Sequence, residues 1–352
     1  MFEIENLVRD NIRKLKPYSS ARDEFKGEAS VYLDANENSF GSPIDPELGA
    51  FNRYPDPLQK EVKEKLSMIK GVPPGNIFLG NGSDEAIDLL FRIFCEPKKS
   101  SVIICPPTYG MYEVCADISD IAVKKVNLLA NFELDVEGIL ENTDAETRLL
   151  FICSPNNPTA NSFHPEDVEL LIQKFPGIVV VDEAYINYSR QKSAIRYLTD
   201  YENVVVLQTF SKAWGLAALR LGMAFASGHI VDYLNKVKPP YNINLATQQL
   251  ALQALDNIEW VNQHIRETVA ERNKLETGLK QNILVEKVYP SDANFILVKV
   301  KYAKAIYNYF AAQGIIVRDR SKITLCEGCL RITVGAPTEN EALLQALNKF
   351  EL

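Results

Sequence analysis

Short apolar runs alternate with helical patterns between about residues 60 and 250. The four clearest runs cover residues 101–105, 149–153, 178–181 and 204–207, and each is rich in Val, Ile and Leu or in Ile and Phe. Runs of this kind, hydrophobic on both faces and separated by helices, are typical of buried strands in a mainly parallel sheet. The pattern therefore predicts an α/β unit with a mainly parallel sheet flanked by helices.

The pattern changes after about residue 255. A long charged helical stretch over residues 265–274 is followed by a strand-like run over 294–300 and a helix over 303–313. Two more strand candidates, over 315–318 and 330–334, and a closing helical stretch come next. This order predicts a smaller α+β domain.

The length of 352 residues exceeds what one hydrophobic core usually supports. We therefore predict a large domain over residues 46–255 and a small C-terminal domain over residues 256–352. We expect residues 1–45 to form an N-terminal arm that contributes to the small domain or packs on a partner chain. Its first ten residues read as an amphipathic helix rather than a cleavable signal.

Composition narrows the classes of function. A net charge of −8 argues against nucleic acid as a partner. No apolar run approaches the roughly 20 residues that span a bilayer, so we expect no membrane segment. Six cysteines in a chain of this length indicate a reduced, cytoplasmic protein. Cys326 and Cys329 have metal-like spacing, but no further ligand pair completes a zinc site, so we expect no metal.

Polar clusters follow each of the four apolar runs. They cover residues 106–109, 154–159, 182–185 and 211–212. Ligands of open α/β sheets bind at the carboxyl ends of the strands. The four clusters are therefore expected to meet at one edge of the sheet.

The segment from Thr209 to Arg220 carries the most specific chemistry. Hydroxyls of Thr209 and Ser211, with the Arg220 guanidinium, suit a phosphate dianion. A partly desolvated Lys212 among them can lose its proton and form a Schiff base. Together these groups indicate pyridoxal 5′-phosphate, which is joined by its aldehyde and anchored by its phosphate.

Two further strand ends fit the same cofactor. Asp182 would be costly to bury without a cation, and a protonated pyridine nitrogen supplies one. Asn157 and Tyr185 suit the phenolic oxygen of the ring. Taken singly, Asp182 as a helix cap and Asn157 as part of a turn remain alternatives.

Residues 80–85 form a small, Gly-containing segment before a helical pattern. Such a segment can present free N–H groups to a phosphate, or it can be an ordinary turn with Asp84 as a helix cap. Its glycine spacing does not match the dinucleotide fingerprint, and a nucleotide-binding enzyme would leave Lys212 unexplained.

With these segments in place, the chain resembles the fold-type I pyridoxal-phosphate enzymes, in particular the class II aminotransferases. Within them it is similar to the histidinol-phosphate aminotransferases, over essentially the whole chain. The wider resemblance rests on residues 32–38, 53–57, 80–85, 154–159, 181–185, 209–222 and 329–335. The narrower one rests on residues 15–18, 314–319 and the segment around Arg331.

The resemblance implies a role for each site residue. Lys212 would be the Schiff-base lysine and the proton-moving base, and Asp182 would pair with the pyridine nitrogen. Asn157 and Tyr185 would hold the ring oxygen, and Tyr109 would stack on the ring. The phosphate would be held by Ser83, Asp84, Thr209, Ser211 and Arg220. Tyr54 would reach the phosphate of the neighbouring subunit, which implies a homodimer with shared active sites.

The implied reaction converts L-histidinol phosphate and 2-oxoglutarate into imidazole-acetol phosphate and L-glutamate, in histidine biosynthesis. Arg331 would bind the carboxylate of glutamate or 2-oxoglutarate. With Arg318, Tyr18 and Asn36 it would also face the substrate phosphate. A surface ion pair is the alternative interpretation of Arg318 and Arg331.

Other functions on the same fold remain open from the sequence. An aromatic-amino-acid aminotransferase or a threonine-phosphate decarboxylase would use the same cofactor. A cofactor-sensing regulator would need a separate DNA-binding domain. We expect none, because the predicted enzyme domains occupy the chain and no basic stretch could bind DNA. One departure from the family pattern is Ala160, where glycine usually follows Asn-Pro-Thr. If that position needs a positive φ, alanine is modestly strained there.

Overall fold

The computed structural model describes residues 3–18 and 31–351. Its larger sheet has seven strands in the order β1-β7-β6-β5-β4-β2-β3. The strands are β1 (Ile77–Asn81), β2 (Ser101–Ile104), β3 (Ala122–Lys125), β4 (Thr147–Cys153), β5 (Ile178–Asp182), β6 (Val204–Thr209) and β7 (Leu221–Ala226). Only β7 runs antiparallel to its neighbours, so the predicted mainly parallel sheet is confirmed.

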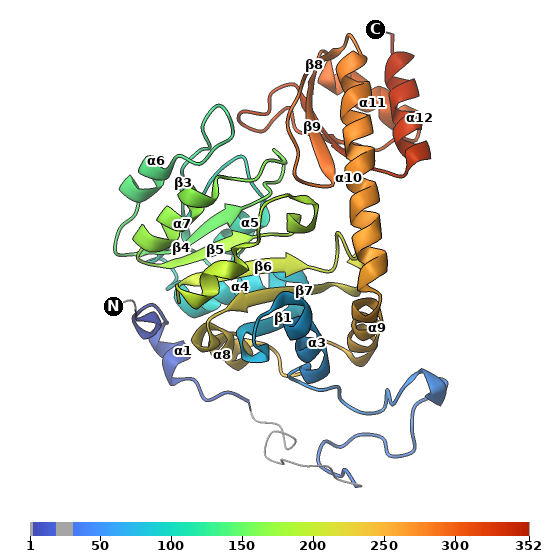
Figure 1. Cartoon of the computed structure of the whole chain (residues 1–352). Coiled ribbons are helices and arrows are strands. Elements are labelled where there is room, and N and C mark those ends of the chain that lie inside the picture. Colours follow the sequence, from blue (N-terminus) through green and yellow to red (C-terminus); the bar gives the residue numbers. More distant parts are fainter. Residues whose placement is uncertain (1–2, 19–30, 352) are drawn as a thin grey trace.

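Helices cover both faces of this sheet (Figure 1). They are α3 (Lys60–Lys70), α4 (Gly82–Phe94), α5 (Met111–Ile118), α6 (Val136–Glu141), α7 (Pro165–Lys174), α8 (Gly228–Val237) and α9 (Leu245–Asp256). Successive residues of β5 enter two different hydrophobic clusters, Val179 and Val181 in one and Ile178 and Val180 in the other. Because both faces are buried, the strands read as continuous apolar runs.

The smaller sheet is antiparallel, in the order β10-β11-β9-β8. Its strands are β8 (Val285–Val288), β9 (Phe295–Val300), β10 (Arg318–Asp319) and β11 (Cys329–Thr333), and it packs with α10 (Ile258–Gln281), α11 (Ala303–Ala312) and α12 (Pro337–Asn348). The predicted α+β unit is therefore present. The strand expected over residues 315–318 is reduced to the two residues of β10. Figure 1 shows α10 running from the end of α9 up to this sheet.

The N-terminal residues lie elsewhere than expected. After a short 3-10 turn (Ile4–Asn6), α1 (Asp10–Lys14) follows. Ile4, Val8 and Ile12 are buried in the same cluster as α4 of the large sheet. The expectation that this segment joins the small domain is wrong for residues 4–12, because their apolar stripe finds its partner on α4.

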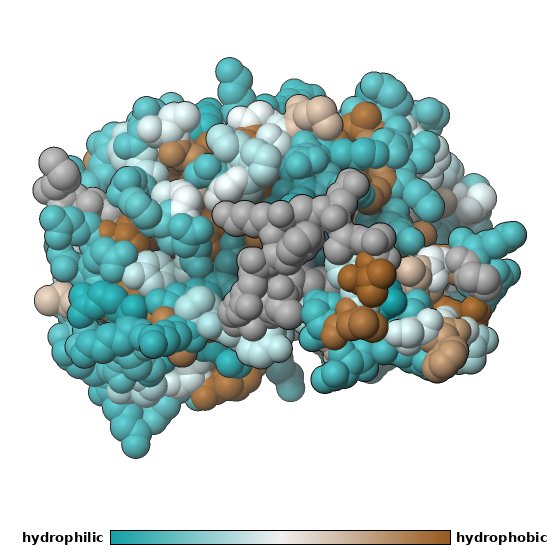
Figure 2. All heavy atoms as spheres, turned by 90° about the horizontal axis from the view of Figure 1, so that it is seen from below, coloured by the Kyte–Doolittle hydropathy of each residue, from teal (hydrophilic) through white to brown (hydrophobic). Residues whose placement is uncertain are grey.

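Residues 31–57 extend away from the body of the molecule before α3 begins (Figure 1). Large apolar side chains on this arm are exposed, Leu33 by 83% and Phe40 by 103%. Figure 2 views the molecule from the side of the arm and shows hydrophobic residues on a mostly hydrophilic surface. Exposed apolar side chains at this density are a feature of interaction surfaces.

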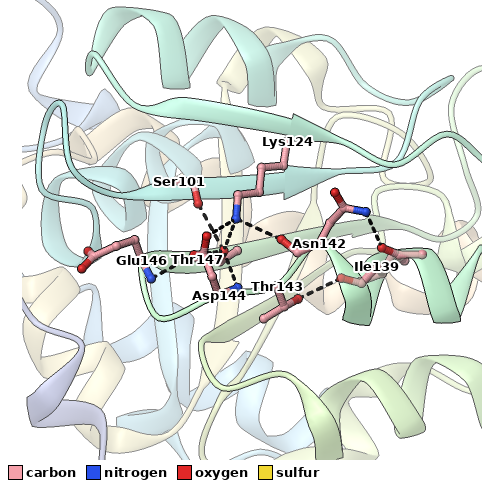
Figure 3. A network of polar contacts seen from close by, with 9 residues as sticks. Ser101, Lys124, Ile139, Asn142, Thr143, Asp144, Glu146 and Thr147 are labelled. Atoms are coloured by element: carbon pink, nitrogen blue, oxygen red, sulfur yellow. Dashed lines mark hydrogen bonds and ion pairs between the residues drawn. The ribbon is translucent and has the colours of Figure 1, made fainter.

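A polar network fastens the edge strand β3 to the sheet (Figure 3). Lys124 Nζ donates hydrogen bonds to the Asn142 carbonyl at 2.9 Å, to Asp144 Oδ2 at 2.6 Å and to Thr147 Oγ1 at 3.0 Å. The hydrogen bonds from Lys124 and Thr147 lower the pKa of Asp144 to about 2. The network satisfies polar groups at a strand edge that would otherwise be open to solvent.

Lys63 of α3 is buried, and burial lowers its pKa to about 8. The folded protein therefore carries an ammonium at neutral pH that the unfolded chain solvates better. We expect Lys63→Met to raise the free energy of unfolding at pH 7 by up to about 2–3 kcal/mol. The gain should shrink as pH rises from 8 to 10.5, where the unfolded lysine also loses its proton. Urea titrations at pH 7 and 10 measure this, with exposed Lys60→Met as the control. Equal stability of wild type and Lys63→Met at pH 7 would contradict it.

Candidate active site

A cavity of about 150 Å³ lies where the carboxyl ends of β4, β5 and β6 meet the start of α4. Ten residues singled out from the sequence line it: Ser83, Asp84, Tyr109, Asn157, Asp182, Tyr185, Thr209, Ser211, Lys212 and Arg220. The four polar clusters thus meet at one edge of the sheet, as parallel strands require.

Asp182 ends β5 and is 3% exposed. Its Oδ2 accepts a hydrogen bond from the Tyr112 hydroxyl at 2.7 Å, and its Oδ1 accepts one from the Ala184 N–H at 3.1 Å. Burial raises the pKa of Asp182, while these hydrogen bonds and Lys212 oppose the rise. A buried carboxylate held in this way suits a cationic partner in the cavity.

Tyr112 is a residue that the sequence analysis missed. It is fully buried on α5 and stacks against Phe151 at 4.6 Å between ring centroids. Its one signal in the sequence is its spacing of three residues from Tyr109, which precedes the start of α5 at Met111. The two rings meet edge to face at 5.5 Å.

Lys212 follows β6 and points its amine toward Tyr185, with Nζ 5.6 Å from the ring centroid. Burial is the largest cause that lowers the pKa of Lys212, and the nearby cations Arg331 and Arg220 add to it. Asp182 and Asp84 act in the opposite direction. The environment therefore favours the neutral amine, which is the nucleophilic and basic form.

The opposite end of the cavity is built for an anion. Arg220 has φ 53° and places Nη1 3.5 Å from Ser211 Oγ and Nη2 3.5 Å from Asp84 Oδ2. The N-terminus of α4 begins here at Gly82. Gly222 allows this approach, because a Cβ at that position would overlap the backbone of Gly82 and Ser83. Free N–H groups, hydroxyls and a guanidinium together suit a phosphate.

In the loop after β4, Ala160 does adopt the positive φ that was considered for this position. Ala160 has φ 68° and is fully buried. Its N–H donates to the Asn156 carbonyl at 2.7 Å, and its carbonyl accepts from the Asp292 N–H at 2.8 Å. These bonds hold a non-glycine residue in the left-handed region, at the modest cost expected for alanine.

Arg331 reaches the cavity through Asn157. Its Nη1 donates to Asn157 Oδ1 at 2.6 Å, and its guanidinium lies 5.2 Å from the Phe295 ring centroid. Arg318 lies directly opposite Arg331 in the β10–β11 pair. Within residues 3–18 and 31–351, no carboxylate forms an ion pair with either arginine, so the structure does not support a surface ion pair.

Comparison with known proteins identifies the family to which a chain with this site belongs. A family model for aminotransferases of class I and II matches residues 32–350. The chain belongs to this family. The histidinol-phosphate aminotransferase of Parabacteroides distasonis is 50% identical over 352 residues, covering 100% of both chains. That of Cytophaga hutchinsonii is 52% identical over 349 residues, covering 99% of each.

Solved structures share the fold of this aminotransferase at lower identity. The histidinol-phosphate aminotransferase of Sinorhizobium meliloti in complex with pyridoxal-5′-phosphate has a TM-score of 0.78 and 24% identity, over 90% of this chain and 89% of that one. The L-threonine-O-3-phosphate decarboxylase of Porphyromonas gingivalis has a TM-score of 0.73 and 22% identity, over 85% and 91%. The predicted fold class is thereby confirmed.

The residues of the cavity fit the cofactor of an aminotransferase. A buried carboxylate faces a lysine whose pKa is lowered, and an anion site lies at the other end of the same space. Asp182 suits the pyridine nitrogen, Lys212 the aldehyde, and Arg220 with Ser211 the phosphate. In the described ranges, no three His, Cys, Asp or Glu side chains are grouped to hold a metal ion.

Five of the predicted site residues do not line the aminotransferase cavity, and one of these, Arg331, contacts the lining residue Asn157. Tyr18 is 71% exposed, Asn36 and Arg318 are exposed, and Tyr54 is 49% exposed and stacks on Tyr241 at 4.5 Å. Three of them belong to the N-terminal segment or the arm. Cys326 and Cys329 are buried free thiols. None of the helices in the described part of the chain has the length and hydrophobicity to cross a membrane.

Proposed function

We propose that this aminotransferase uses pyridoxal phosphate to convert L-histidinol phosphate and 2-oxoglutarate into imidazole-acetol phosphate and L-glutamate, in histidine biosynthesis. The observation that carries the proposal is the meeting of Lys212, Asp182 and Arg220 around one cavity. The substrate is supported by the names of relatives that are about half identical over the full length.

The cofactor, when bound, supplies an electron sink for the charge that develops at the substrate Cα. Lys212 Nζ holds the exchangeable proton and returns it, because its lowered pKa leaves a fraction of the amine free. Asp182 would hold the protonated pyridine nitrogen with its carboxylate, which accepts a hydrogen bond from the Tyr112 hydroxyl at 2.7 Å. Arg220, Ser211 and the start of α4 would hold the cofactor phosphate and so restrict how the cofactor can be oriented.

Two substrates with different anions must use this site in turn. Glutamate carries an α-carboxylate, whereas histidinol phosphate carries a phosphate in its place. Arg331 and Arg318, opposite each other on β11 and β10, can grip either anion.

A threonine-phosphate decarboxylase is the second candidate from the sequence. The decarboxylase of Porphyromonas gingivalis shares the fold at 22% identity, which supports the architecture alone. Relatives at about 50% identity over the full length favour the transaminase.

The test is a panel of amino donors with 2-oxoglutarate and the purified, cofactor-loaded enzyme. Histidinol phosphate should be converted with the highest kcat/KM, and glutamate should form in equal amount. An enzyme that converts aromatic amino acids but does not convert histidinol phosphate would contradict the proposal. Release of carbon dioxide from threonine phosphate would support the decarboxylase instead.

We further propose a homodimer with shared active sites. The arm of residues 31–57 exposes Leu33, Phe40 and Leu48 and leaves the body of its own subunit (Figure 1). Tyr54 lies on this arm and does not line the cavity of its own chain. A second copy of the chain would cover the apolar side chains and receive Tyr54 at its phosphate site.

The shared site predicts recovery of activity on mixing. Lys212→Ala and Tyr54→Ala homodimers should each be nearly inactive. A hybrid dimer contains one site with both native residues, so exchange should restore about a quarter of wild-type activity. The rate is measured after subunit exchange, with each variant alone carried through the same exchange as the control. No recovery after demonstrated exchange would rule out the shared site.

We also propose domain boundaries near residues 45 and 255 and a cytoplasmic location. The gap between the two sheets, from Ala226 to Val285, supports a boundary near α9 and α10. The six free, buried cysteines support a reducing compartment.

A further inference from the structure

Three arginines share one face of the small sheet. Arg318 and Arg320 are two residues apart, and the Arg320 N–H continues the ladder by donating to the Cys329 carbonyl at 2.9 Å. Side chains two residues apart on extended backbone point to the same side. Arg331 lies opposite Arg318, so it points to that side too. We call Arg318, Arg320 and Arg331 the arginine face.

The arginine face lacks an anionic partner. Nε of Arg320 and Nε of Arg331 are buried without a hydrogen-bond partner. Over the part of the chain that the structure describes, the Arg320 guanidinium has no hydrogen bond or ion pair at all. Burial lowers the pKa of Arg320, and Arg331 and Arg318 lower it further. Buried donors without partners are costly, so their persistence indicates an anion that this face binds.

The arginine face borders the cofactor cavity. Arg331 donates to Asn157, a residue of the cavity lining. Tyr185, which also lines the cavity, is close enough to Arg320 to act on it electrostatically. An anion held by Arg320 and Arg331 would therefore belong to a molecule that reacts in this cavity.

We propose that Arg320 is a specificity-determining residue, which binds the phosphate group of the substrate and distinguishes it from a carboxylate. This inference rests on the proposed function. A carboxylate offers two oxygens and one charge, which one guanidinium satisfies in a bidentate pair. A phosphate dianion offers three oxygens and a second charge, and the Arg320 guanidinium supplies the additional donors and the second positive charge.

The test compares the two substrates in Arg320→Gln. Loss of one charge-assisted hydrogen bond should lower kcat/KM for histidinol phosphate about 10- to 100-fold, mainly through KM. The half-reaction with glutamate should change less than about threefold, and Arg320→Lys should lie between. Exposed Lys322→Gln is the control for a general loss of positive charge, and it should affect neither substrate. An equal loss with both substrates, or no loss with histidinol phosphate, would overturn the proposal.

A binding measurement separates this inference from the proposed function. Calorimetric titration of the pyridoxal-phosphate-loaded enzyme with inorganic phosphate reports on the arginine face without any turnover. Binding by wild type that weakens about 10-fold in Arg320→Gln supports the anion site, even if histidinol phosphate proves not to be the substrate. Equal affinity in both proteins would overturn the role of Arg320 while leaving the transaminase assignment intact.

Discussion

Lys212→Ala is expected to lower the transamination rate by about 10⁴-fold, the upper range for loss of a positioned general base. Lys212 Nζ lies 5.6 Å from the Tyr185 ring centroid, and Lys212 lines the cavity together with Asp182 and Arg220. Its pKa is lowered mainly by burial, which favours the neutral amine that can accept a proton. Single-turnover absorbance changes with glutamate measure the loss directly, because they do not depend on product release.

Two controls make this result specific. Borohydride reduction of the wild-type enzyme should fix the cofactor to the peptide that carries Lys212, and this peptide should be unlabelled in Lys212→Ala. Exposed Lys192→Ala removes a lysine outside the cavity and should keep wild-type activity. Labelling of another lysine, or near-normal turnover by Lys212→Ala, would refute the assignment of the reactive amine.

The sequence predicted the part of the site that lies at strand ends. Apolar runs fix where buried strands stop, and parallel strands bring those stops to one edge. The pattern of apolar runs therefore predicts that Lys212, Asp182 and Asn157 lie together. Tyr112 was missed because its hydroxyl meets Asp182 across 70 positions of sequence, on a helix whose position no local pattern sets.

The N-terminal residues and the small sheet were harder to predict. An amphipathic stripe such as Ile4, Val8 and Ile12 reveals that it will be buried but not against which helix. The strand expected over 315–318 is reduced to Arg318–Asp319; Ile315 and Val317 pack in the same cluster as Ile306 and Phe310 of α11. Arg320 carries no signal in the sequence, because a charged residue near a strand end is normally at the surface.

Asp182→Asn is expected to separate activity from stability. Removing one partner of a buried ion pair costs about 3–5 kcal/mol, so kcat should fall by roughly 10²- to 10³-fold. Tyr112 can still donate to the amide oxygen, so the change removes charge more than geometry. Steady-state rates with saturating cofactor measure the effect. Unchanged kcat would show that the carboxylate charge does not act on the ring.

The cofactor-free protein should respond in the opposite direction. Burial raises the pKa of Asp182, so the folded state holds a proton that the unfolded chain releases as pH rises above about 4. Wild-type stability is therefore lost as pH rises from there through the raised pKa, and Asp182→Asn should melt at a higher temperature at pH 7.5. Asp144→Asn is the matched control at the sheet edge, where hydrogen bonds lower the carboxyl pKa to about 2 (Figure 3). That variant should melt lower and keep full activity. If Asp182→Asn also melted lower than wild type, the carboxylate would be stabilising the empty fold, and its placement for a bound cation would be disproved.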